Sequence, residues 1–400
     1  MEDERCIHPC IFLQRLAQVA WLSVSFLMLM FWIPHPGQQI PVFEDWVSAF
    51  QTGDLLTQAI VVVGLSGVLF FTVQHIRLLI LNFQLMGIFR RSPEYARFVT
   101  SPMQTQELAL PLASAMAINV GFIAGALFVP KLWTIVEVLF PFAMVAFLAI
   151  GIWALALYAR VFRQATSGAF DLGGTASFAQ VLPAFSFAMV AVGLAAPASM
   201  SHTPWVVGIS VTFSTFFAVT AIVLAVLKTA MALSNMLTKG VDPAGLPTLW
   251  IWVPILTVLA ITLMRQDHGV VHTLGLGVQT AWLGPLLMVV SAQVLVLILG
   301  AVAMHPHDYL AKVWNGEVKG AAVFALICPG VALSVSLHFL INKGFVASGL
   351  VSHGGIAYGL LNLMPMAIMV LTIVAFLRLL RSFTIERAQW ASAQLSNAHS

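Results

Sequence analysis

The sequence contains very little charge. Asp, Glu, Lys and Arg make up 8% of its 400 residues, whereas a globular domain has about 25%. Together with 60% hydrophobic residues and a mean hydropathy of +0.96, this shortage excludes a water-soluble globular protein and predicts a polytopic membrane protein. The formal net charge of +3 is too small to indicate nucleic acid as a partner.

Cysteine is equally scarce, and the three residues Cys6, Cys10 and Cys328 exclude a disulfide framework. Cys6 and Cys10 lie on a polar terminus with one histidine between them and no fourth ligand, so we expect no metal there. The first residues, MEDERCIHPC, are polar, and no small-residue cleavage site follows the first apolar run. We therefore expect no cleaved signal peptide.

The motifs of enzymes and cofactor sites are missing as well. The sequence has no P-loop, dinucleotide fingerprint or nucleophile elbow, so we predict no catalytic residues and no cofactor. His268 and His272 have helical ligand spacing, but we expect them in a short loop without a third ligand. His75 and His338 are predicted near opposite faces of the membrane, which disfavours a haem between them.

Long apolar runs, in contrast, are abundant. A membrane-spanning helix needs about 20 mostly apolar residues, and ten segments meet this requirement. They are residues 12–33, 55–76, 108–129, 132–159, 179–199, 205–227, 248–264, 275–303, 319–342 and 355–377. After the second span, an amphipathic stretch at about 78–97 is predicted to lie on the membrane surface.

Lys and Arg are distributed unequally between the two sides of the membrane, if the chain crosses it ten times. With the N-terminus inside, 15 of the 18 fall in inner segments, and the outer segments hold only Lys131, Arg265 and Lys343. This asymmetry follows the positive-inside rule. It predicts a ten-span membrane domain of residues 12–377 with two cytoplasmic tails, residues 1–11 and 378–400.

Helix-breaking prolines recur in the outward-running spans. Pro111, Pro183, Pro254 and Pro329 each lie in one of four such spans, and Gly330 follows Pro329. Proline removes a backbone donor, and the freed carbonyl needs a neighbour or water. Ordinary kinks for packing are one explanation, and a ring of kinked helices that lines a passage is the other. We predict an all-α fold of ten transmembrane helices, paired as five hairpins around a central pore.

The side chains expected to line this pore are apolar or weakly polar. We predict lining or gating roles for Ser114, Asn119, Phe187, Phe324, Cys328, Pro329 and Gly330. Hydroxyls and kinked backbone, without a ladder of carboxylates, suit an anion or a neutral solute better than a metal cation. Glu137 is predicted within a span, where it either has a functional role or reaches toward Lys131 and the headgroups.

This arrangement of spans resembles the tellurite-resistance and C4-dicarboxylate transporter superfamily (TehA-like), which includes the plant slow anion channels. The resemblance covers the whole chain and implies five inner helices around a pore, an outer ring of five, and a homotrimer. In that family a phenylalanine beside the kink of the ninth helix plugs the pore. Here Cys328 occupies that place and Phe324 lies one helical turn earlier, which makes Phe324 the candidate plug.

Two shorter stretches resemble a bacterial protein group named TsoY, some members of which contain selenocysteine. They are LPLASAMAINVGFIAGALFVPKLW, residues 110–133, and ALICPGVAL, residues 325–333. This second resemblance implies a role in handling sulfur or selenium oxyanions.

We therefore expect an inner-membrane anion channel or uniporter whose partners are the lipid bilayer and a small anion. The solute is expected to be a sulfur or selenium oxyanion or a small carboxylate, and it crosses without a covalent step. Two alternatives from other classes remain open. One is a membrane-embedded thiol redox protein that uses Cys328, and the other is an accessory subunit whose spans pack against a partner.

Overall fold

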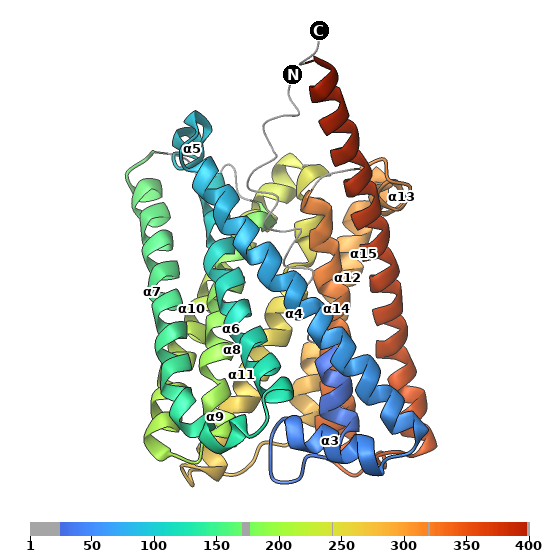
Figure 1. Ribbon diagram of the computed structural model, residues 1–400. Coiled ribbons are helices and arrows are strands. Elements are labelled where there is room, and N and C mark those ends of the chain that lie inside the picture. The colour runs from blue at the N-terminus through green and yellow to red at the C-terminus, as the bar shows by residue number, and fades with distance from the viewer. Residues whose placement is uncertain (1–24, 170–176, 242, 319–320, 398–400) are drawn as a thin grey trace.

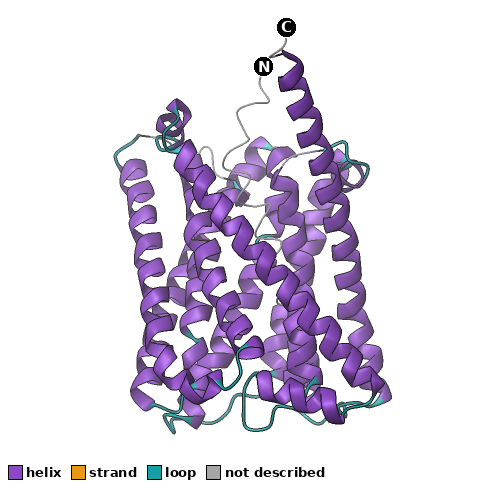
Figure 2. Ribbon diagram, in the orientation of Figure 1, coloured by secondary structure: helices purple, strands orange, loops and turns teal. Residues whose placement is uncertain are grey.

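The computed structural model describes residues 25–169, 177–241, 243–318 and 321–397, although not the side chains of 243, 244, 321, 322, 324, 380 and 382–397. Throughout these residues the chain forms helices joined by loops, without a strand (Figures 1 and 2). The all-α prediction is therefore confirmed. Of the predicted first span, residues 25–32 are described and helical. The predicted tail of residues 1–11 lies outside the described residues.

The helices follow one another with short connections. The α-helices are α3 (Phe43–Thr52), α4 (Leu55–Phe89), α5 (Pro93–Phe98), α6 (Ala109–Phe128), α7 (Val136–Thr166), α8 (Leu182–Leu194), α9 (Ala196–Met200), α10 (Pro204–Lys239), α11 (Trp252–His272), α12 (Leu283–Met304), α13 (Tyr309–Trp314), α14 (Ile327–Phe339) and α15 (Ile356–Asn397). Short 3₁₀ segments precede several of them: η2 (Pro102–Leu108), η3 (Leu132–Ile135), η4 (Phe178–Val181), η5 (Pro243–Trp250), η6 (His305–His307) and η7 (Ala321–Leu326). A π-helical segment, η8 (Leu340–Val346), follows α14.

Eight helical segments among the described residues are long and apolar enough to cross a membrane, which indicates a multi-pass membrane protein. They are Leu55–Phe89, Pro102–Phe128, Leu132–Thr166, Phe178–Met200, Pro204–Lys239, Gly245–His272, Leu283–His307 and Ile356–Leu379. Each matches one of the ten predicted spans. The predicted span at 319–342 is divided into η7, α14 and η8, each of which is too short to cross a membrane alone.

Burial separates inner helices from outer ones. In the most apolar window of the segment that contains α8, 94% of the residues are buried, whereas in α12 the share is 17%. In the windows of α4, α7 and α15 the buried share is only 22%, 28% and 28%, and their exposed side chains include large apolar residues such as Phe142 and Leu371. Exposed apolar side chains on this scale are expected of helices that face lipid. The helices therefore form an outer layer around a central group.

Several predicted boundaries were wrong by two turns or more. α11 continues to His272, so Arg265 and both histidines of the predicted loop belong to a helix. α12 begins at Leu283 rather than 275, because Gly275 and Gly277 have positive φ angles that interrupt a helix. Residues 78–89, predicted as a surface stretch, continue α4 without a break. α15 also extends beyond its predicted span, to Asn397, and the cytoplasmic tail from residue 378 stays a prediction.

The prolines predicted as internal kinks have a different position. Pro111, Pro183, Pro254 and Pro329 each lie in the first turn of an α-helix that follows a 3₁₀ segment. A first-turn residue has no intrahelical partner for its N–H, so proline costs nothing there. Upstream of the proline, the chain uses the tighter 3₁₀ bonding instead. The same junction therefore recurs in four helices.

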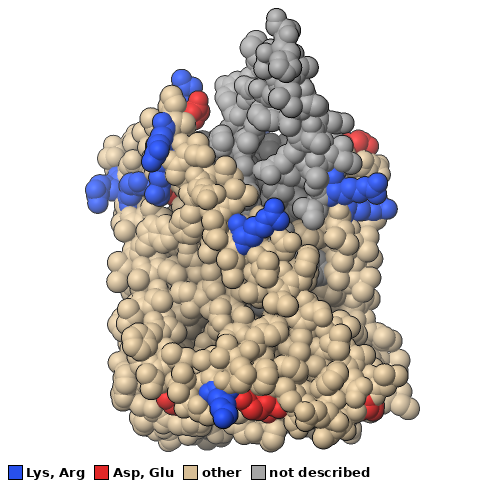
Figure 3. Space-filling model, viewed as in Figure 1, with Lys and Arg blue, Asp and Glu red and all other residues tan. Residues whose placement is uncertain are grey.

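Charged side chains gather at the two ends of the bundle, separated on the face shown by a wide uncharged band (Figure 3). One end, which we call the basic end, carries Arg90, Arg160 and Lys239 at the ends of α4, α7 and α10. There the buried carboxylate of Glu107 on η2 accepts hydrogen bonds from Arg90 (2.8 Å) and Arg160, which ties η2 to both helices. Lys131 lies at the opposite end, where its backbone N–H donates to Glu44 (2.7 Å).

Candidate functional site

A cavity of about 300 Å³ lies between the inner helices. Its longest wall is one face of α11, which contributes Pro254, Val258, Ile261, Arg265 and His268 at a spacing of three to four residues. These residues span 14 positions, or about 21 Å of helix at 1.5 Å per residue. The cavity is therefore elongated along the bundle.

The other walls come mainly from four further segments. One face of α14 and η8 runs parallel to the α11 wall, from Cys328 through Val335 to Lys343. Helix α6, helix α8 and residues 25–32 contribute mostly apolar side chains, such as Met116 and Met189. Helix α9 and two connecting segments add a few more, among them Ser199, Gln39 and Gln279. Lys343 and Gln279, at the end away from the basic end, are exposed, so the cavity opens toward that side.

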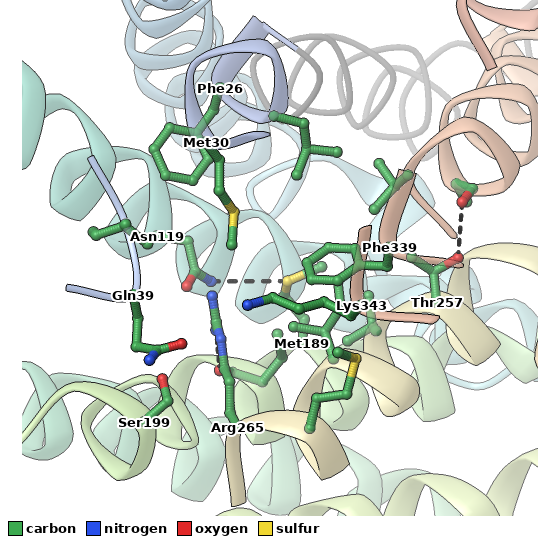
Figure 4. Close-up of a pocket in the computed structure, with 18 of the residues that line it drawn as sticks. Phe26, Met30, Gln39, Asn119, Met189, Ser199, Thr257, Arg265, Phe339 and Lys343 are labelled. Carbon is green, nitrogen blue, oxygen red and sulfur yellow. Dashed lines mark hydrogen bonds between the residues drawn. The ribbon is translucent and has the colours of Figure 1, made fainter. Parts of the chain in front are cut away.

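Two cations converge in the wide part of this cavity. Figure 4 shows the Arg265 guanidinium and the Lys343 ammonium pointing toward the same space beside Asn119. Arg265 donates one hydrogen bond, from Nη1 to the backbone oxygen of Val192 (2.8 Å). Within the described residues, no carboxylate lines the cavity or forms a salt bridge with either cation. The arrangement leaves guanidinium N–H groups available for an anion.

The nearest carboxylates have other partners. Asp267 accepts hydrogen bonds from Gln279, Thr280 and Trp282, and so organises the loop before α12. Glu137, the carboxylate predicted within a span, accepts hydrogen bonds from the Ser201 hydroxyl and the His202 backbone N–H (2.6 Å each). Both carboxylates are therefore held by groups of the loops, and neither forms a salt bridge with Arg265 or Lys343.

A smaller cavity of about 50 Å³ continues toward the basic end. The four segments η2, η4, η5 and η7 each contribute to it, and successive members of this set contact one another. We call these four segments the 3₁₀ collar. Phe185, Pro254 and Cys328 line both cavities, so they form the boundary between them. The two cavities therefore meet at these three residues and together trace a path between the inner helices.

A buried polar network supports the α11 and α14 walls from behind. The Gln293 amide of α12 donates to the hydroxyls of Thr257 (2.7 Å) and Ser336 (3.0 Å), which also contact each other (2.9 Å). Hydrogen bonds between side chains of neighbouring helices fix their relative rotation. The network therefore holds the two longest lining faces in register.

The residues predicted to line a pore divide into two groups. Asn119 lines the larger cavity, Pro329 lines the smaller one, and Cys328 lines both. Pro254, which was predicted only as a helix kink, also lines both. Asn119 donates to the backbone oxygen of Ala115 (3.1 Å) and to the sulfur of Met189 (3.9 Å). The side chain of Phe324 lies outside the described residues.

Three predicted residues lie elsewhere. Phe187 is fully buried and packs between Tyr158 and Phe217, because it is two residues from Phe185 and so faces the opposite side of α8. The Ser114 hydroxyl donates to the backbone oxygen of Leu110 (2.9 Å) and does not line the cavity. Gly330 faces Thr372 of α15, where a larger residue would clash, so it serves helix packing.

Sequence reasoning missed the two cations, and of the phenylalanines on α8 it favoured Phe187 over Phe185. Arg265 and Lys343 were assigned to outer loops because each follows an apolar run. A signal was present: Val258, Ile261, Arg265 and His268 continue one helical periodicity across the charge. The Gln39 amide nitrogen donates a hydrogen bond to Nε2 of His268 (3.2 Å). No group of three metal-binding side chains occurs in the described residues.

No family model, curated protein or solved structure matches this chain. The function must therefore be argued from the cavity and its residues.

Phe185→Ala is expected to widen the boundary between the two cavities and so to raise the flux of any solute that crosses it, because it removes a ring there and an apolar constriction opposes ions by staying dry. Flux into proteoliposomes measures this effect. Phe187→Ala is the matched control, since it removes the same ring from the packed core two residues away. It should cost about 3–5 kcal/mol of stability without raising flux. Unchanged flux in Phe185→Ala would show that the boundary lies elsewhere.

Proposed function

We propose that this protein is an anion channel or uniporter of a bacterial inner membrane. The observation that carries the proposal is the convergence of Arg265 and Lys343 in a cavity whose described lining contains no carboxylate. An enclosed cation without a counter-ion is unfavourable, because no attraction offsets the free energy lost when the cation leaves water. A bound anion supplies that attraction, so the site favours an anionic solute over a neutral one.

The path supports transport rather than binding alone. It runs from the exposed Lys343, past Arg265, to the boundary at Cys328 and on into the 3₁₀ collar. Its walls are the outward-running segments of the predicted ring, which is consistent with a TehA-like pore. In this proposal, residues 25–32 and 321–346 belong to the first and ninth of ten spans. The basic end then faces the cytoplasm, and the protein assembles as a homotrimer.

A redox role for Cys328 has less support. At the boundary its neighbours in the cavity wall are Phe185 and Pro254, which supply neither a base nor a cation. A reactive thiolate needs such a group nearby. We therefore assign Cys328 to the wall of the path.

Flux in proteoliposomes tests the proposal. Vesicles with the purified protein, loaded with a fluorescent reporter of volume or membrane potential, are challenged with potassium salts of chloride, sulfite, selenite, acetate and malate. With a potassium ionophore present, potassium crosses through the ionophore and the anion through the protein, so we expect swelling or a current for at least one anion. In the control, an anionophore replaces the potassium ionophore. Potassium then has no route, and we expect no swelling. Cation flux with no anion flux would contradict the proposal.

A further inference from the structure

The cavity has two chemically distinct parts. Near its mouth lie the polar groups Arg265, Lys343, Asn119, Gln39 and Ser199 (Figure 4). From there to the boundary at Phe185 and Cys328, the lining is apolar except for Thr257, and it includes Met116, Met189, Val258, Ile261, Val331 and Val335. The Thr257 hydroxyl is already hydrogen-bonded to Ser336 (2.9 Å) and to the backbone oxygen of Ala332 (3.1 Å). On α11 this apolar part extends from Arg265 to Pro254, or about 16 Å of helix.

We propose that the cavity binds a monocarboxylate with a short alkyl chain, its carboxylate on Arg265 and its chain along the apolar part. This inference rests on the proposed anion path and names its solute. A guanidinium matches the geometry of a carboxylate with two parallel N–H donors. The alkyl chain gains by leaving water for the apolar wall.

Inorganic oxyanions fit this cavity less well. A sulfite or selenite ion is hydrated on every side, and polar groups on only one side of the cavity can replace that water. The remaining oxygens would face valine, isoleucine and methionine side chains, which cannot donate a hydrogen bond. A monocarboxylate presents its charge to one side only.

Dicarboxylates are also disfavoured. Arg265 and Lys343 point into the same space (Figure 4), so both charges serve one end of a bound solute. At the far end of the described apolar part, the lining residues Phe185, Pro254 and Cys328 carry no positive charge. The second carboxylate of an extended dicarboxylate would be buried there without a partner.

Binding to a chain-length series tests the inference. The dissociation constants of acetate, butyrate and hexanoate are measured for the purified full-length protein by calorimetry or thermal shift. Each buried methylene contributes about 0.8 kcal/mol, or about fourfold in affinity, so hexanoate should bind about 100- to 300-fold more tightly than acetate. Hexanamide and hexylammonium, which share the chain, control for uptake into detergent and should not bind.

Two threonine substitutions on α11 test whether the alkyl chain binds in the apolar part of the cavity. Val258→Thr puts a hydroxyl in the apolar part and should lower the ratio of hexanoate to acetate affinity severalfold. Val253→Thr, at a buried position outside the cavity lining, should leave the ratio unchanged. Equal affinity for acetate, hexanoate, chloride and sulfite, or tighter binding of succinate than of butyrate, overturns the inference but leaves an anion path. Loss of the anion path itself would appear separately, as absence of flux for every anion.

Discussion

Arg265→Gln is expected to reduce anion flux at least 100-fold. The substitution keeps a polar side chain of similar reach but removes the charge and the paired donors that face the cavity. Charge-assisted hydrogen bonds contribute about 1.5–3 kcal/mol each, and two of them account for an effect of this size. Anion flux into proteoliposomes, normalised to the reconstituted protein, provides the measurement.

The thermal stability of the same variant separates a binding role from a structural one. Without an anion, Arg265→Gln should be at least as stable as the wild type, because it removes an enclosed charge that has no acidic partner among the described residues. If Arg265 mainly held helices together, the variant would melt at a lower temperature.

Lys343→Gln, at the exposed mouth, should lower flux only about 3- to 10-fold, with an effect that shrinks at high salt.

The double substitution Arg90→Ala with Arg160→Ala is expected to be the most destabilising change at the basic end. Glu107 is 1% exposed, and both of its cationic partners would be lost together. A buried carboxylate without a partner costs about 3–5 kcal/mol. Thermal and denaturant unfolding in detergent, compared with the wild type, would report this loss.

The reverse substitution, Glu107→Gln, should cost much less. The side chains of Arg90 and Arg160 are 45% and 38% exposed, so water and lipid headgroups can solvate them when the carboxylate is gone. Adding Glu107→Gln to the double variant should therefore restore part of its stability. A Glu107→Gln variant less stable than the double alanine variant would contradict this order.

The spans could be predicted from the sequence because lipid demands long apolar runs whatever the tertiary contacts are. Their ends were harder to place. α11 was predicted to stop before Arg265, because a single charge after an apolar run normally marks a loop, whereas here the helix continues and turns that charge inward. The division of the ninth predicted span into η7, α14 and η8 likewise has no signal in hydropathy.

The site could be predicted only in part. Asn119 and Cys328 were identified by their polarity in apolar surroundings, and both line the larger cavity. Only the structure shows which of Phe185 and Phe187 faces the cavity. α8 is buried on all sides, so its sequence has no polar face that would indicate which side of the helix points toward the cavity. The four prolines were visible, but their place at 3₁₀ junctions depends on contacts between segments far apart in sequence.

The 3₁₀ collar differs from α-helix in length as well as in bonding. A 3₁₀ segment rises about 2.0 Å per residue and turns 120°, whereas an α-helix rises 1.5 Å and turns 100°. The eight residues of η5 are therefore about 4 Å longer, and wound by about 160° more, than the same residues would be as α-helix. A change from one form to the other would therefore alter the length of the segment and rotate its side chains about the helix axis at the same time. In the walls of the smaller cavity, the length of a segment and the direction in which its side chains point thus cannot change independently.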